Sequence, residues 1–62
     1  MQVSYREKQF TFDETMTVQQ LLKKLKILPE SVLVVRNGQL LTEDRSLAPE
    51  DSVKIVPVVS GG

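Results

Sequence analysis

The chain has 62 residues, which allows one small domain and leaves no room for a second. Its eight Lys and Arg residues balance its eight Asp and Glu residues, so it lacks the basic excess of proteins that bind nucleic acid or anionic membranes. His and Cys are both absent, which excludes disulfides, thiolate and imidazole catalysis and the usual zinc sites. Because the charge is balanced, proteins are the expected partners.

Two alternating segments open the chain. Apolar and polar residues alternate from residue 1 to residue 6, and the alternation returns over residues 9–13, where Phe10 and Phe12 share one face. A pattern with period two is typical of half-buried strands. We therefore predict a hairpin with its turn at residues 7–8 and with both Phe side chains in the core.

A helix follows, and its start carries the clearest local signal in the sequence. Thr17 can cap a helix with Gln20 three residues later as its reciprocal partner, an arrangement called a capping box. Four apolar residues recur at helical spacing and must face the sheet: Val18, Leu21, Leu22 and Leu25. Pro29 lies where a helix cannot easily continue, so the helix is predicted to end near Ile27.

The second half of the chain predicts another hairpin and a last strand. The hairpin covers residues 32–41, because an apolar, β-branched run leads into Asn37-Gly38, a strong signal for a two-residue turn. Residues 42–51 are mostly polar and are predicted to form a connecting loop anchored by Leu47. The last strand is predicted from Ser52 to about Val58.

The resulting order is ββαββ, in which one helix can cover one face of a mixed sheet of four or five strands. This α+β arrangement is the β-grasp architecture of ubiquitin, and the order in which the strands pair is taken from that resemblance. Residues 1–58 are predicted to form the domain. Residues 59–62 have nothing to pack and are predicted to be a flexible C-terminal Gly-Gly tail.

One combination of features extends over the whole chain. It consists of a first strand that starts at Met1, the helix start Thr17-Val18 with Leu21-Leu22, the turn Asn37-Gly38, Glu50-Asp51 before the last strand, and the terminal Gly61-Gly62. Together these features resemble the ThiS and MoaD family of ubiquitin-like sulfur carrier proteins. The ending is also similar to that of the tRNA-thiolation carriers of the TtuB type, so a ThiS-like or TtuB-like protein is expected.

The resemblance implies a chemistry that is centred on Gly62. In this family an E1-like adenylating enzyme of the ThiF or MoeB type uses ATP and magnesium to adenylate the C-terminal glycine. Sulfur then replaces AMP and leaves a thiocarboxylate. Gly62 is therefore implied as the attachment residue, with Gly61, Ser60 and Val59 threading into the partner's site. Glycine suits this role because it adds no side chain beside the carboxylate and passes through narrow channels.

On this reading the chain is a carrier and not an enzyme, and it binds no cofactor or metal itself. The other implied partners are a sulfurtransferase and an acceptor synthase or thiolase. Alternation also places Leu33, Val35, Val56 and Val58 on the sheet face opposite the helix, where the resemblance implies docking of the activating enzyme. The alternative is that these side chains are scattered surface apolar residues.

Other readings remain open at this point. Lys23, Lys24 and Lys26 are interpreted as a solvated helix face, and the carboxylate pairs Asp13-Glu14 and Glu43-Asp44 as ordinary turn residues. No membrane span or signal peptide is predicted, so the expected location is the cytoplasm. The chain could instead be a modifier joined to lysines through Gly62, or a non-covalent β-grasp module. The sulfur acceptor is left open among thiamine, molybdopterin and tRNA thiolation pathways.

Overall fold

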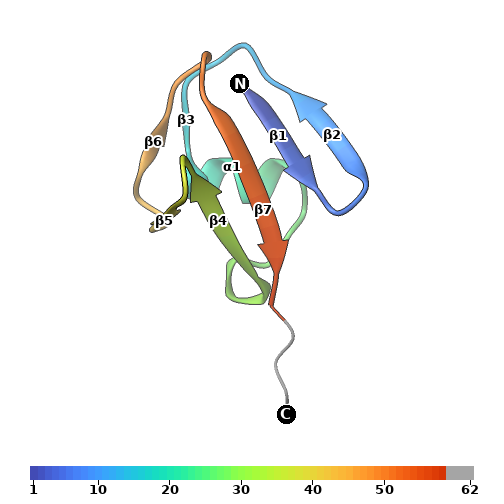
Figure 1. The fold of residues 1–62 in the computed structure, drawn as a ribbon. Helices are drawn as coiled ribbons and strands as arrows, with labels where there is room; N and C mark the ends of the chain where they lie inside the picture. The colour runs from blue at the N-terminus through green and yellow to red at the C-terminus, as the bar shows by residue number, and fades with distance from the viewer. Residues whose placement is uncertain (59–62) are drawn as a thin grey trace.

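The computed structural model describes residues 1–58, in which one helix packs against one face of a mixed five-stranded sheet (Figure 1). The strands of this sheet are, in spatial order, β2 (Lys8–Thr11), β1 (Gln2–Tyr5), β7 (Ser52–Pro57), β4 (Val32–Arg36) and β5 (Gln39–Leu41). β1 and β7 are parallel, and the other neighbouring pairs are antiparallel. The predicted α+β fold, with its ββαββ order on a mixed sheet, is confirmed.

The first hairpin is present, but its turn lies one residue earlier than predicted. Tyr5 pairs with Lys8, so the two residues that connect the strands are Arg6 and Glu7. Arg6 takes a positive φ of 56°, which allows the chain to reverse at this point. Sequence reasoning missed this position because Arg carries no preference for such a conformation.

The helix α1 (Val18–Lys24) begins as the capping box predicts. The Gln20 N–H donates to Thr17 Oγ1 over 3.1 Å, and the Thr17 N–H donates to Gln20 Oε1 over 2.9 Å. Two further N–H groups of the first turn, those of Val18 and Gln19, donate to backbone carbonyls of the loop between β5 and β6. The free donors at the helix start are thus bonded by its own cap and by a distant loop.

The helix ends earlier than predicted. α1 stops at Lys24, not near Ile27, and the cause lies before Pro29. Lys26 takes a left-handed φ of 59° and donates its N–H to the Lys23 carbonyl, while the Ile27 N–H donates to the Leu22 carbonyl over 2.9 Å. These two bonds form a Schellman motif, which closes the helix. Its left-handed position usually holds glycine, so a lysine there gives no signal in the sequence.

A second, two-stranded sheet was not predicted. β3 (Met16–Thr17) pairs antiparallel with β6 (Ser46–Leu47), which lies within the stretch predicted as a loop. Leu47 is fully buried, as its role as an anchor predicts, and it lies opposite the buried Met16. Two-residue strands carry no periodic pattern, which explains why the pairing was missed.

The second hairpin and the last strand match the prediction closely. Arg36 pairs with Gln39 around Asn37 and Gly38, whose positive φ angles of 54° and 76° fit a two-residue hairpin turn. A 3-10 turn, η1 (Pro29–Ser31), leads into β4. No helix within residues 1–58 is long and apolar enough to cross a bilayer.

The core lies between α1 and the sheet. Its buried members are Met1, Val3, Met16, Val18, Leu21, Leu22, Val32, Val34, Leu47, Val53 and Ile55. Phe10 and Phe12 are half-buried and pack against the rim of this cluster, so their predicted place in the core holds only in part. The helix stripe faces inward as predicted, with Leu25 half-buried at its end.

Candidate functional site

The sheet face that points away from α1 collects the predicted docking residues. Leu33 pairs directly with Val56, and Val35 pairs directly with Lys54, in the antiparallel ladder of β4 and β7. Directly opposed residues in such a ladder share a face of the sheet. Val58 follows the end of β7, and it is the next residue on this face if the alternation of the strand continues. The structure thus places Leu33, Val35 and Val56 on the face opposite the helix, and alternation past the end of β7 predicts Val58 there as well.

A fifth apolar residue belongs to this face and was missed. Leu40 of β5 pairs with Val35 and leaves 62% of its surface exposed. The signal was present in the sequence, because a two-residue turn at Asn37-Gly38 pairs residues 36 and 39 and therefore residues 35 and 40.

We call Leu33, Val35, Leu40, Val56 and Val58 the apolar face. Leu33 is 44% exposed and Val58 is 42% exposed, while Val35 and Val56 are half-buried. Large apolar side chains that gather on one sheet face at this exposure form a surface suited to protein contact.

The other half of the same sheet face is polar. Ser4 of β1 lies beside Lys54 of β7 and opposite Gln9 of β2, and Gln2 lies opposite Thr11. The outer surface of the sheet is therefore divided. Its apolar side chains lie over β4, β5 and the end of β7, while Ser52 and Lys54 of β7 join the polar side chains of β1 and β2. The predicted docking surface would therefore be confined to the apolar part of this face.

The chain leaves the sheet beside the apolar face. After β7 the Val58 N–H donates to the Ser31 carbonyl over 2.8 Å, which holds this point against η1 (Figure 1). Of the predicted site residues, Val59, Ser60, Gly61 and Gly62 lie outside the described residues and remain predictions. They follow Val58 directly, and four extended residues span about 14 Å, which is the reach available to the predicted attachment residue Gly62.

At the opposite end of β7, Asp51 organises the loop before the strand. One oxygen of its carboxylate accepts the Ala48 N–H and the Arg36 guanidinium, each over 2.9 Å, and Arg36 also donates to the Ser46 carbonyl. The bond from the Ala48 backbone and the charge of Arg36 lower the pKa of Asp51, against an opposing effect of burial. This carboxylate is used to fix β6 and β7 relative to β4.

The acidic pairs serve local structure. Glu14 forms an ion pair with Lys24 over 3.0 Å, and Asp44 accepts a hydrogen bond from the Thr42 hydroxyl, which lowers the pKa of Asp44. Among residues 1–58, no three potential carboxylate, imidazole or thiolate ligands gather as they would around a metal ion.

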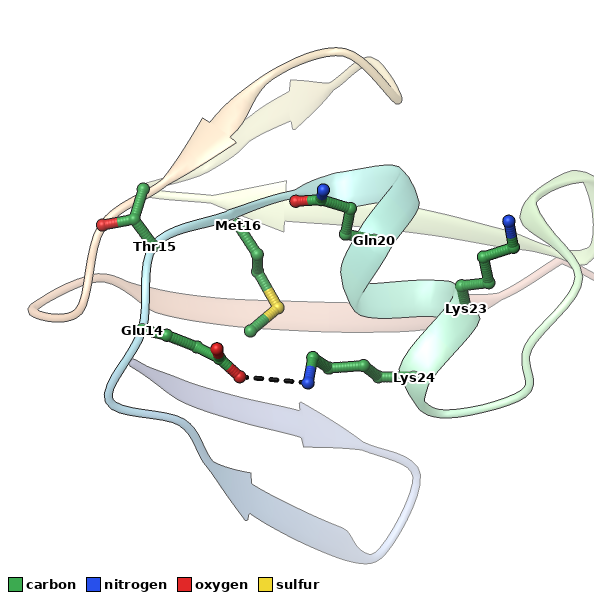
Figure 2. A pocket seen from close by; sticks show the side chains of 6 residues that line it. All are labelled: Glu14, Thr15, Met16, Gln20, Lys23 and Lys24. Atoms are coloured by element: carbon green, nitrogen blue, oxygen red, sulfur yellow. Dashed lines mark ion pairs between the residues drawn. The ribbon is translucent and has the colours of Figure 1, made fainter.

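One pocket of about 430 Å³ lies between the start of α1 and the segment before β3, and Figure 2 shows the side chains that line it. Gln20 is engaged in the capping box, Lys24 and Glu14 pair with each other, and Met16 belongs to the core. Of its polar side chains, Gln20, Glu14 and Lys24 therefore have partners within the chain, whereas Lys23 forms no ion pair among residues 1–58. Most of the lining of this pocket therefore serves the fold.

These features define a class, the small ubiquitin-like β-grasp proteins, here with an apolar sheet face beside the point where the chain leaves the domain. A model of the ThiS family matches residues 2–62, and the chain therefore belongs to the ThiS family. It is similar to the crystal structure of the thiamine biosynthesis protein ThiS from Geobacter metallireducens, with 29% identity, a TM-score of 0.70 and full coverage of both chains.

Membership of this family supports a role as a sulfur carrier. ThiS-like carriers are small proteins on which other enzymes act. The family implies, in general terms, an E1-like adenylating partner and a sulfurtransferase. The predicted resemblance to the family is thus confirmed.

Proposed function

We propose that this protein carries sulfur as a thiocarboxylate on Gly62 and delivers it in thiamine biosynthesis. The choice of pathway is supported by the similarity to a thiamine biosynthesis protein over the full length of both chains. The structural observation that carries the proposal is the position of Val58. The Gly-Gly segment begins within three residues of a point that is fixed next to the apolar face.

The chemistry requires a carboxylate and an activating partner. A carboxylate oxygen of Gly62 attacks the α-phosphorus of ATP, pyrophosphate leaves, and an acyl adenylate forms. A persulfide carried by a sulfurtransferase then attacks the acyl carbon and AMP leaves, which gives an acyl disulfide. A thiol supplies the two electrons that cleave its S–S bond and release the thiocarboxylate. The activating enzyme supplies the ATP site, the magnesium and the catalytic groups, while this chain supplies the reacting carboxylate.

The apolar face has a defined part in this proposal. It seats the ThiF-type activating enzyme, while the tail enters the enzyme's active site. Because Val58 belongs to both the face and the exit, docking on this face fixes where the tail starts. Holding two reacting groups in position in this way converts a bimolecular step into an effectively unimolecular one.

Two variants of the chain end test the proposal. Deletion of Gly61 and Gly62 keeps every buried residue of the described chain, so the domain should unfold at an unchanged temperature, while adenylation by the activating enzyme should disappear. Addition of one alanine after Gly62 keeps both glycines but moves the carboxylate, and it should abolish adenylation as well. Incorporation of AMP is measured by intact mass spectrometry. Adenylation of the deleted chain would contradict the proposal.

A further inference from the structure

A second surface lies beside the tail exit, on the helix side of the domain. It is a groove of about 340 Å³ lined by Gln19, Lys23, Lys26, Ile27, Leu28 and Pro29. Leu28 leaves 64% of its surface exposed, the largest exposed fraction among the large hydrophobic residues of the described chain. Its lining combines apolar side chains with two lysines, and it contains no carboxylate.

The groove is connected to the exit by hydrogen bonds. The Ser31 N–H and the Ser31 hydroxyl both donate to the Leu28 carbonyl, over 3.0 and 2.8 Å, and the Ser31 carbonyl accepts the Val58 N–H. The loop that follows α1 therefore lies at the same end of the domain as the end of β7 (Figure 1). An accepting enzyme that approaches the tail from the helix side therefore passes close to this groove.

The two lysines of the groove are not neutralised by neighbours. Lys24 uses its ammonium group on Glu14, but neither Lys23 nor Lys26 forms an ion pair with any other residue among 1–58. Figure 2 shows the Lys23 side chain pointing away from the Glu14–Lys24 pair. The groove thus presents two free positive charges beside an exposed leucine, although the chain as a whole has no net charge.

Lys26 occupies a position that disfavours it. Its φ of 59° is the left-handed conformation of a helix end, which favours glycine because any other side chain is strained there. Strained residues of this kind gather at functional sites. A lysine here lowers the stability of the domain and places a cation on the rim of the groove.

From these observations we propose that the groove binds an acidic segment of the enzyme that accepts the sulfur. In this segment an apolar side chain lies between two carboxylates. The apolar side chain contacts Ile27 and Leu28, and the carboxylates pair with Lys23 and Lys26. This inference rests on the proposed function, because it assigns a second partner to the same tail.

The two partner enzymes would use separate surfaces of the domain. The apolar face and the groove lie on opposite sides of the sheet, so an enzyme seated on the face leaves the groove uncovered. The accepting enzyme can therefore engage the carrier before the activating enzyme releases it. Charges at the rim of an interface act mainly on the rate of association, which suits a carrier that must change partners.

The test uses the double variant Lys23→Glu and Lys26→Glu. The thiocarboxylate is prepared chemically, from an intein thioester and sulfide, so that delivery is measured independently of loading. With the purified accepting synthase, kcat/KM for sulfur delivery should fall about tenfold at low salt, and raising the ionic strength to about 0.5 M should narrow the difference. Adenylation by the activating enzyme should change less than about twofold.

The matched control is Lys8→Glu with Arg45→Glu, which makes the same change of net charge at exposed positions outside the groove. It should deliver sulfur at the wild-type rate. Delivery by the groove variant at the control rate would overturn the inference, and so would a loss of adenylation with delivery intact. If the wild-type chain itself accepts no AMP, the proposed function fails instead, which separates the two outcomes.

Lys26→Gly gives a second, independent readout. Glycine relieves the left-handed strain, so the melting temperature should rise by roughly 4 °C, while the lost charge should slow delivery about threefold. A purely structural role for Lys26 predicts higher stability with unchanged delivery. That result would overturn the inference.

Discussion

Where β4 pairs with the end of β7, apolar residues lie on both faces of the sheet, but only those on one face are buried. Val34 and Ile55 point toward α1 and are 3% and 2% exposed, whereas their chain neighbours Leu33 and Val56 point outward. On β1, by contrast, the inward Val3 alternates with the polar Gln2 and Ser4. An antiparallel sheet with one solvated face usually shows the second pattern.

The apolar residues on the two faces of these strands need different explanations. Burial against the helix explains Val34 and Ile55, because removing that area from water stabilises the domain. It does not explain Leu33 and Val56, which lie over no second layer among residues 1–58. The proposed docking of a partner on the apolar face would account for their apolar character.

The largest expected effect comes from the inner face. Ile55→Ala should lower the free energy of unfolding by about 2–5 kcal/mol, because it removes buried methyl groups and leaves a cavity against α1. A domain of this size has a total stability of roughly 3–9 kcal/mol, so the variant should be close to unfolded. Urea denaturation followed by circular dichroism measures the change.

A much smaller loss of stability is expected at the neighbouring residue, Val56. Val56→Ala on the outer face should cost less than about 1 kcal/mol, since the side chain is only half-buried. If both variants lost the same stability, the distinction between the two faces would be wrong.

The second-largest effect is expected in the rate of adenylation. Leu33→Thr with Val56→Thr keeps residues that suit strands but removes apolar surface, and kcat/KM for adenylation should fall at least tenfold, equivalent to about 1.4 kcal/mol. The unfolding free energy should change by less than about 1 kcal/mol. Initial rates with the purified ThiF-type enzyme provide the measurement.

A matched change on the polar half of the same face serves as the control for that experiment. Gln2→Thr with Ser4→Thr alters two outward residues of β1 and should leave adenylation within about twofold of the wild-type rate. Equal losses from both double variants would show that the apolar half has no special part in docking.

A smaller effect is expected at the helix start. Thr17→Ala removes the hydroxyl that accepts the Gln20 N–H, and stability should fall by about 1 kcal/mol. Adenylation of the folded protein should be unchanged, because the capping box lies on the helix side of the sheet. A thermal unfolding curve and an adenylation assay on one sample measure both quantities, and a loss of activity in fully folded protein would contradict the assignment of the two sides.

The smallest effect depends on pH and concerns Asp51. Its pKa is lower in the folded chain than in the unfolded chain, so the ionised carboxylate stabilises the fold. That contribution is complete above about pH 4 and is lost as the pH falls through the lower, folded-state pKa. Asp51→Asn should therefore lower the melting temperature at pH 7 and flatten its decline below pH 4. An unchanged acid profile would contradict this role.

Much of the fold follows from local patterns in the sequence. Alternation located the strands, Thr17 and Gln20 located the helix start, and Asn37-Gly38 located the second hairpin, because each acts through nearest neighbours in the chain. The apolar face was also within reach of the sequence, since alternation around Val34 and Ile55 determines which residues point outward. Leu40 was missed only because the register of its hairpin was not carried across to Val35.

The remainder depended on contacts between distant residues. β3 and β6 pair across about thirty residues, and each is too short to show a period. The helix ends at a left-handed Lys26, where the preferred residue would be glycine, so the sequence gives no stop signal there. For the same reason, the groove beside Leu28 could be recognised only once the path of the chain after α1 was known.

The central claim, that Gly62 carries sulfur, is tested most directly by intact mass spectrometry of the protein purified from its native host. The account predicts a species in which one oxygen is replaced by sulfur, with fragmentation placing the sulfur on Gly62, and predicts its loss when Gly61 and Gly62 are deleted. High-mass adducts with Gly-Gly branches on lysines of other proteins, without any sulfur-containing species, would contradict it.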